Sequence, residues 1–160
     1  MKKETETFIK NIVKKITNEY NVKYPIDIDE LIKKFGGNTV KGLSLGIIKN
    51  DNKFTIVSDD TNYQKALMLG FLILHLRFKT NNDAWKNLEN KKYVYKTDMQ
   101  FEQIKEFAYD LLLPDDLFFK ELSKVLDDNK QAKAEDVAEI GKKFKVSPTL
   151  IFSKAKDYIY

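Results

Sequence analysis

Three carboxylates at four-residue intervals are the first residues whose types and spacing could do chemistry. Glu102, Glu106 and Asp110 would share one face of a helix. Such a group can bind Mg²⁺ or Ca²⁺, or act as an acid–base pair. A solvated polar stripe opposite the apolar face that carries Phe101 and Ile104 explains them as well, and we favour the stripe.

His75 is the only histidine among the 160 residues, and the chain has no cysteine. These counts exclude disulfides, thiolate metal sites, a cysteine nucleophile and any zinc site that needs two imidazoles. His75 falls near the end of an apolar helical segment. We therefore favour a hydrogen-bonded histidine over a metal ligand, because one imidazole alone is a poor metal site.

A polar segment, residues 79–98, holds Trp85, Tyr93 and Tyr95 among lysines, and we expect it to be a long loop. Aromatic residues beside basic ones can bind a peptide or single-stranded nucleic acid. They can equally anchor the loop on the body of the protein. Both interpretations stay open, and this loop is our candidate for a partner contact.

The charge is only slightly basic, with 28 lysines and arginines against 24 acidic residues, a net charge of +4. Arg77 is the only arginine, so charge alone gives little support for DNA binding. Residues 133–158 have the length of a helix-turn-helix, but the second helix lacks the arginine, asparagine or glutamine that contacts base edges. We expect its apolar residues to pack on the core or on a partner instead: Leu150, Ile151, Ala155 and Ile159.

No secretion signal is recognisable, and the longest apolar run, residues 66–76, is too short to span a bilayer. We therefore expect a cytoplasmic protein without membrane contact.

The elements that must position these residues follow from the hydrophobic period. We expect an α+β fold of one domain, residues 1–160, with a helix-turn-helix-like subdomain at 133–160. A small three-stranded antiparallel sheet would lie between N-terminal helices and a helical C-terminal half. Helices are expected at 4–20, 28–35, 61–78 (buried and central), 99–113, 115–126, 133–144 and 147–158, and strands at 39–42, 45–49 and 53–58. Asp115 and Asp116, after Pro114, are explained by their place at a helix start.

Four segments, taken in order, resemble the ImmA/IrrE family of zincin-like zinc metallopeptidases, which are common on phages and mobile elements. Residues 25–32 (Pro-Ile-Asp-Ile-Asp-Glu-Leu-Ile) resemble the family's first short helix. Residues 63–75 occupy the place of its His-Glu-x-x-His helix. Residues 106–114 resemble its Phe-Ala-x-x-Leu-Leu-Met-Pro segment, and residues 140–148 its closing helix pair.

The resemblance places apolar residues where the family has its catalytic groups. Leu67 and Phe71 stand at the two histidine positions, Met68 at the general base and Phe101 at the carboxylate ligand. Lys105 stands where the family has a supporting Asn or Asp. No catalytic residue, metal ligand or cofactor is therefore expected, and Leu67, Phe71 and Phe101 would fill the vacated volume as core.

The function implied by the resemblance is that of an inactive metallopeptidase-like protein. It would act by binding a protein partner, such as a repressor or transcription regulator, in the control of a phage or mobile element. Two alternatives remain. One is an active metal-dependent peptidase with unconventional ligands from His75, Glu102, Glu106 or Asp110. The other is a DNA-binding regulator that uses the C-terminal helix pair.

Overall fold

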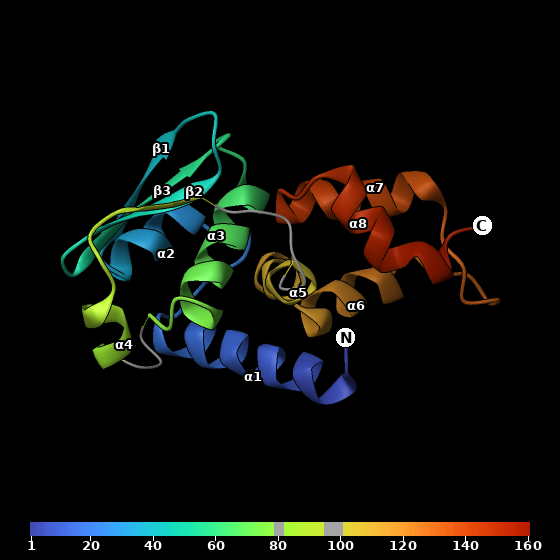
Figure 1. The fold of residues 1–160 in the computed structure, drawn as a ribbon. Helices are drawn as coiled ribbons and strands as arrows, with labels where there is room; N and C mark the ends of the chain where they lie inside the picture. Colours follow the sequence, from blue (N-terminus) through green and yellow to red (C-terminus); the bar gives the residue numbers. More distant parts are fainter. Residues whose placement is uncertain (79–81, 95–100) are drawn as a thin grey trace.

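The protein has an α+β fold in which a four-stranded mixed sheet is followed by a helical C-terminal half (Figure 1). The structure is a computed structural model that describes residues 1–78, 82–94 and 101–160, with only the backbone described at 82–84. The α+β class expected from the sequence is confirmed.

The first part of the chain forms two helices and three strands. These are α1 (Lys3–Glu19), α2 (Ile28–Lys34), β1 (Gly37–Lys41), β2 (Gly46–Asn50) and β3 (Lys53–Ser58). Asp27 caps α2 by accepting a hydrogen bond from the Glu30 amide, as its place in the sequence predicts.

The rest of the chain is mainly helical. It forms α3 (Asn62–Leu74), α4 (Asn82–Asn87), β4 (Lys92–Val94), α5 (Phe101–Leu112), α6 (Asp115–Ser123), α7 (Ala134–Phe144), α8 (Pro148–Ala155) and a 3-10 turn at Lys156–Tyr158. Ser147 caps α8 by accepting from the Leu150 amide, with Pro148 in the first turn, as expected.

The sheet differs from the expected three antiparallel strands. Its order is β1-β3-β2-β4, and β1 runs parallel to β3 while the other pairs are antiparallel. Lys41 ends β1 opposite Ser58, and Gly46 starts β2 opposite Val57. The four residues 42–45 therefore carry the chain over the end of β3 to its other side, so β1 and β2 cannot form the hairpin that their spacing predicted.

The expectation of one long loop at 79–98 is wrong, because part of the segment forms α4 and β4. Lys49 helps to position the described part of this segment that follows α4. Its ammonium, which is buried, donates hydrogen bonds to the Leu88 carbonyl and to Asn90 Oδ1, at 3.0 and 3.1 Å. These bonds hold the chain after α4 against β2 and allow β4 to pair with it.

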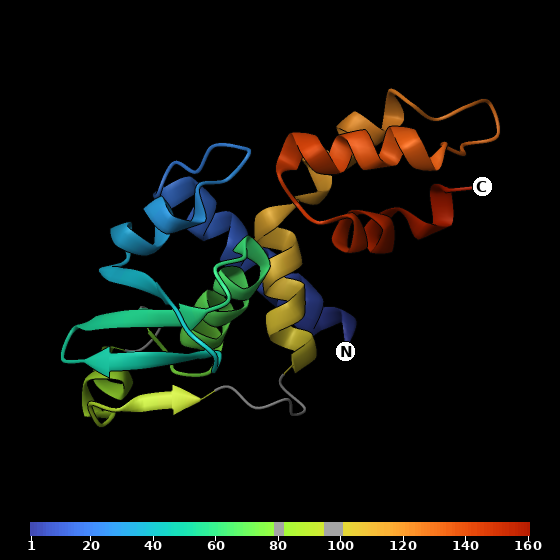
Figure 2. The same cartoon turned by 90° about the horizontal axis from the view of Figure 1, so that it is seen from above.

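Helix α3 lies at the centre of the molecule, between the sheet and α5 (Figures 1 and 2). Gly70 allows the close approach to α5, since a Cβ there would lie 2.8 Å from Phe107 Cδ1. Both sides of α3 are apolar, and Leu69 and Leu72 are fully buried. The central buried helix expected from the sequence is thus confirmed, although it ends at Leu74 and not at 78.

Among the described helices, none combines the length and the apolar character needed to cross a membrane.

Candidate functional site

The four residues that the sequence resemblance placed at catalytic positions lie in the apolar core or pack against it. Leu67 and Met68 on α3 are 4% and 0% exposed. Phe71 on α3 and Phe101 at the start of α5 are partly buried and pack against the same core. Because α3 packs along α5, these positions contribute to apolar packing between the two helices and the core.

His75 follows the last turn of α3. Its backbone amide donates to the Phe71 carbonyl at 3.0 Å, and the two rings lie 6.0 Å apart between centroids. Within residues 1–78, 82–94 and 101–160, no group of three or more His, Asp or Glu side chains is arranged to hold a metal ion.

The three carboxylates of α5 do not form one solvated stripe, so that interpretation is wrong for two of them. The Glu102 side chain is 71% exposed. The side chains of Glu106 and Asp110 are only 22% and 8% exposed. Lys10 of α1 donates to both, at 2.8 Å to Glu106 Oε1 and 2.7 Å to Asp110 Oδ1. The stripe turns inward because α1 packs across α5 and brings this lysine to it.

The same lysine links α1 to the C-terminal helices. Lys10 Nζ lies 3.4 Å from Asp115 Oδ2, and Lys154 of α8 pairs with Asp115 Oδ1 at 2.5 Å. Lys154 also donates to the carbonyl of Leu113. Asp115 therefore does more than favour a helix start, since it joins α1 and α8 at the beginning of α6. We call Lys10, Glu106, Asp110, Asp115 and Lys154 the α1–α5 charge cluster.

Burial and pairing shift the pKa values within this cluster. Burial raises the pKa of Asp110 to about 7, the Lys10 hydrogen bond opposes the rise, and the Glu106 charge adds to it. Burial acts to lower the pKa of Lys10, but hydrogen bonds to Asp110 and Glu106 outweigh it and hold that pKa above its ordinary value. Burial acts to raise the pKa of Asp115, yet the Lys154 and Lys10 contacts bring it below the usual range.

A cavity of about 640 Å³ opens beside the α1–α5 charge cluster. Its walls come from α1, from the segment that follows it and from the α5–α6 corner. Lys10, Asp110 and Asp115 of the cluster line it. The spacing of the carboxylates in the sequence pointed to this site, but no signal singled out Lys10 among the many lysines.

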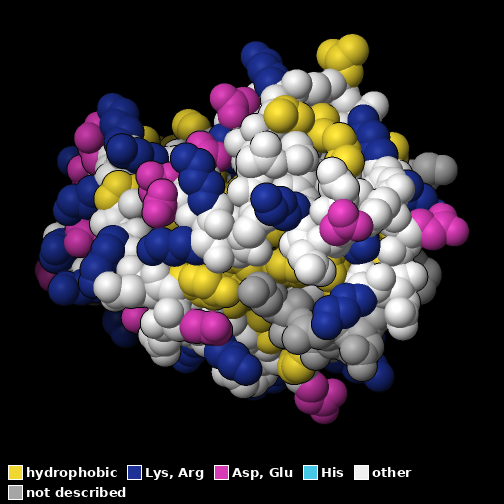
Figure 3. All heavy atoms as spheres, turned by 90° about the vertical axis from the view of Figure 1, so that its left-hand side faces the viewer, with side chains coloured by type: hydrophobic (Ala, Val, Ile, Leu, Met, Phe, Trp, Pro, Cys, Tyr) yellow, Lys and Arg dark blue, Asp and Glu magenta, His cyan; other side chains and the backbone are white. Residues whose placement is uncertain are grey.

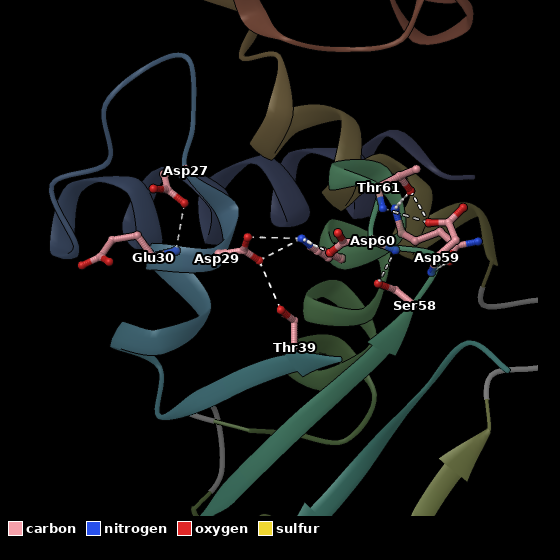
Figure 4. A network of polar contacts seen from close by, with 10 residues as sticks. Asp27, Asp29, Glu30, Thr39, Ser58, Asp59, Asp60 and Thr61 are labelled. Atoms are coloured by element: carbon pink, nitrogen blue, oxygen red, sulfur yellow. Dashed lines mark hydrogen bonds and ion pairs between the residues drawn. The ribbon is translucent and has the colours of Figure 1, made fainter. Parts of the chain in front are cut away.

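A second polar cluster clamps α2 to the start of α3 (Figure 4). Lys65 Nζ, buried on α3, lies 2.9 Å from Asp29 Oδ1 and 2.8 Å from Asp60 Oδ1. The Thr39 hydroxyl also donates to Asp29, and Thr61 caps α3 by accepting from the Gln64 amide. These groups bind one another, so the cluster is accounted for by its structural role.

The candidate partner-binding aromatics have different positions. Trp85 is buried, 4.9 Å from the Phe78 ring and under the Lys49 ammonium, which fits the anchoring interpretation. Tyr93 on β4 is half-buried, and its hydroxyl donates to the Glu89 carbonyl at 3.1 Å. Tyr95 lies outside the described residues.

The outer face of the sheet carries exposed apolar residues that the sequence analysis did not single out. Helices α2 and α3 cover one face, and among the described elements no helix covers the other (Figures 1 and 2). Strand register places Val40, Val57, Gly46 and Val94 in one row on that face. Val40 and Val94 are 45% and 49% exposed, and Ile48 in the neighbouring row is 38% exposed.

The charged side chains at outer-face positions of the described strands are Lys53 and Lys92, which are both positive. We call Val40, Ile48, Lys53, Lys92 and Val94 the outer sheet face. On the side of the molecule where the sheet, α2 and α4 lie, hydrophobic side chains reach the surface among both basic and acidic side chains (Figure 3). Alternating apolar residues in the strands were the sequence signal for this surface. Without the strand order, that pattern could not show which face of the sheet the helices leave uncovered.

The C-terminal helix pair uses its apolar residues for packing. Leu150, Ile151 and Ala155 are buried, and Ile159 is partly buried against the core. Helix α8 packs closely on α7. Gly141 permits this contact, since a Cβ there would lie only 3.1 Å from Ile151 Cγ2. The expectation that these residues pack is confirmed.

No known protein family matches the chain, and a search of curated proteins found no significant match. The class that the fold and the site define is an α+β protein with a four-stranded mixed sheet, a buried central helix and a helical C-terminal half. No family is identified.

Proposed function

We propose that this protein is a non-catalytic relative of the ImmA/IrrE metallopeptidases that acts by binding a protein partner. As the resemblance implies, the partner would be a repressor or transcription regulator of a phage or mobile element. The observation that carries the proposal is the burial of Leu67 and Met68 in the apolar core, at the positions that the resemblance assigns to the family's first histidine and general base.

The chemistry of these side chains supports the loss of catalysis. A zinc peptidase needs imidazole or carboxylate ligands with polar groups around them to orient the ligands. Leucine, methionine and phenylalanine offer no such ligand here. Burial of Leu67 and Met68 instead stabilises the fold by roughly 1.5–3 kcal/mol each.

The outer sheet face supports the binding part of the proposal. Exposed Ile48 and Val94 on the neighbouring strands β2 and β4, and Val40 on the opposite edge strand β1, offer apolar contact area. Lys53 and Lys92 supply positive charge on the same face. The complementary partner is a segment of protein with apolar side chains flanked by aspartate or glutamate. This surface leaves the α3–α5 interior undisturbed, so binding does not require the old catalytic positions.

A displayed library of short peptides tests both parts. Peptides selected on the wild-type protein should combine apolar and acidic residues. Their affinity should fall at least tenfold on the Val40→Asp/Val94→Asp variant, which removes apolar area and repels acidic ligands. The matched control is Phe119→Asp on α6, where the side chain is 41% exposed, and it should leave affinity unchanged.

The selected peptides also report on catalysis. Incubated with the protein and added zinc, they should remain intact by mass spectrometry. Cleavage would contradict the non-catalytic assignment. Selected peptides that bind the double aspartate variant as well as the wild type would contradict the assignment of the outer sheet face.

A further inference from the structure

The cavity beside the α1–α5 charge cluster combines apolar walls with carboxylates. Val13 and Val22 on one side and Leu117 on the other supply apolar surface, and Asp110 and Asp116 supply acidic groups. At about 640 Å³ the cavity has the size of a small-molecule site.

Asp110 supplies the observation that points to a ligand. Its side chain is only 8% exposed and it lines the cavity. Oδ1 accepts from Lys10 at 2.7 Å, but Oδ2 is buried and has no hydrogen-bond partner among the described residues. A buried carboxylate oxygen left without a donor is costly, and a ligand that donates to it removes that cost.

Asp116 places a second carboxylate on the cavity wall. It is exposed, and no ion pair to it is found among the described residues. Its charge acts on the partly buried Tyr24 hydroxyl, since burial and the Asp116 charge together raise the pKa of Tyr24. The Tyr24 hydroxyl donates its proton to the Leu111 carbonyl at 2.7 Å and not to Asp116. The Asp116 carboxylate therefore remains available to accept from a ligand.

The surrounding charge favours a cation. Lys10 and Lys154 already bind carboxylates of the cluster, and Lys14 is an exposed side chain on the cavity wall. The acidic side chains outnumber these lysines: Glu106, Asp110, Asp115 and Asp116. A bound cation would balance this excess of negative charge.

We propose that the cavity binds a group made of a short alkyl chain ending in an ammonium or guanidinium. The alkyl chain lies against Val13, Val22 and Leu117, and the cation donates to Asp116 and, after a rotation that turns its carboxylate toward the cavity, to Asp110 Oδ2. This site is distinct from the outer sheet face and does not rest on the proposed function. A free amine and the side chain of a lysine or arginine in another protein share this chemistry.

The test uses n-butylguanidinium and n-butylammonium as probes, followed by NMR chemical shifts and by calorimetry. We expect saturable binding of one probe per chain, with shifts at residues that line the cavity. Sodium butyrate, which has the same alkyl length and the opposite charge, should not bind. Affinity should be higher at pH 8 than at pH 6, because Asp110 must be ionised to accept from the cation without competition from a proton.

Variants assign the effect to the cavity. Asp110→Asn keeps the shape and should weaken binding at least tenfold, and Asp116→Asn at the exposed position should weaken it several-fold without disturbing the core. Asp128→Asn, an exposed carboxylate outside the cavity, is the control and should bind like the wild type. Equal binding by all variants, or no saturable binding by the wild type, would overturn the proposal.

A pair of peptides separates the two sources of the ligand. If a protein side chain is the ligand, an arginine-containing peptide with blocked ends should bind more tightly than butylguanidinium, and its citrulline analogue should not bind. If the ligand is a free amine, the peptide should bind no better than the small probe. Either result supports the cavity as a cation site, whereas binding of the citrulline peptide as tight as that of the arginine peptide would contradict it.

Discussion

Truncation of Met68 is the most informative perturbation of the α3 interior. Met68 is fully buried, and the proposed relationship places it where an ImmA/IrrE peptidase has its general base. If the side chain fills core volume, Met68→Ala leaves a cavity and loses apolar burial. Substitutions of this kind cost about 2–5 kcal/mol.

Urea unfolding measures this cost. A chain of this size unfolds with a slope of roughly 2 kcal/mol per molar urea, so the midpoint should fall by about 1–2.5 M. The slope itself should stay the same, since the fold is unchanged. Met68→Leu nearly conserves volume and should cost less than about 1.5 kcal/mol.

An exposed position supplies the matched surface control. Val40→Thr, at a side chain that is 45% exposed, should change the free energy of unfolding by no more than about 0.5 kcal/mol. A loss below about 1 kcal/mol for Met68→Ala, with Val40→Thr costing as much, would refute the claim that this position is core.

Three further outcomes follow from the structure. Because burial raises the pKa of folded Asp110 to about 7, above its ordinary value of 3.8, the folded state binds more protons than the unfolded state between those values. This residue therefore makes stability fall as pH rises from about 4 to 7. Urea unfolding at pH 5 and pH 7 should show that decline in the wild type and a smaller one in Asp110→Asn; parallel declines would contradict the assignment. Lys65→Met removes the cation between Asp29 and Asp60, both partly exposed, and should cost about 1–2 kcal/mol by urea unfolding, against no measurable loss for the exposed Lys33→Met. Gly70→Ala places a Cβ 2.8 Å from Phe107 and should lower the melting temperature by calorimetry, despite the higher helix propensity of alanine, and an unchanged or higher value would show that α3 and α5 are not in close contact.

Local signals in the sequence predicted most of the helices. Asp27 and Ser147 cap α2 and α8 as their positions indicate, and Pro114 separates α5 from α6. These signals depend on side chains that bind the backbone only a few residues away, so the order of residues is enough to find them.

Features that depend on distant residues were missed. The parallel pairing of β1 with β3 depends on where residues 42–45 cross the sheet, and the order in α4 and β4 depends on the buried Lys49. The candidate site shows the same limit. The spacing of Glu106 and Asp110 was visible, but their counter-charge, Lys10, lies about a hundred residues earlier and resembles every other surface lysine.

The most direct test of the central claim is the zinc content of the purified, untagged protein, by elemental analysis before and after incubation with zinc followed by dialysis. With leucine, methionine and phenylalanine at positions 67, 68, 71 and 101, we predict well under one zinc per chain in both samples. The content should also be the same in wild type and in His75→Ala. One tightly held zinc per chain, lost in His75→Ala, would contradict the account and support an active site with unconventional ligands.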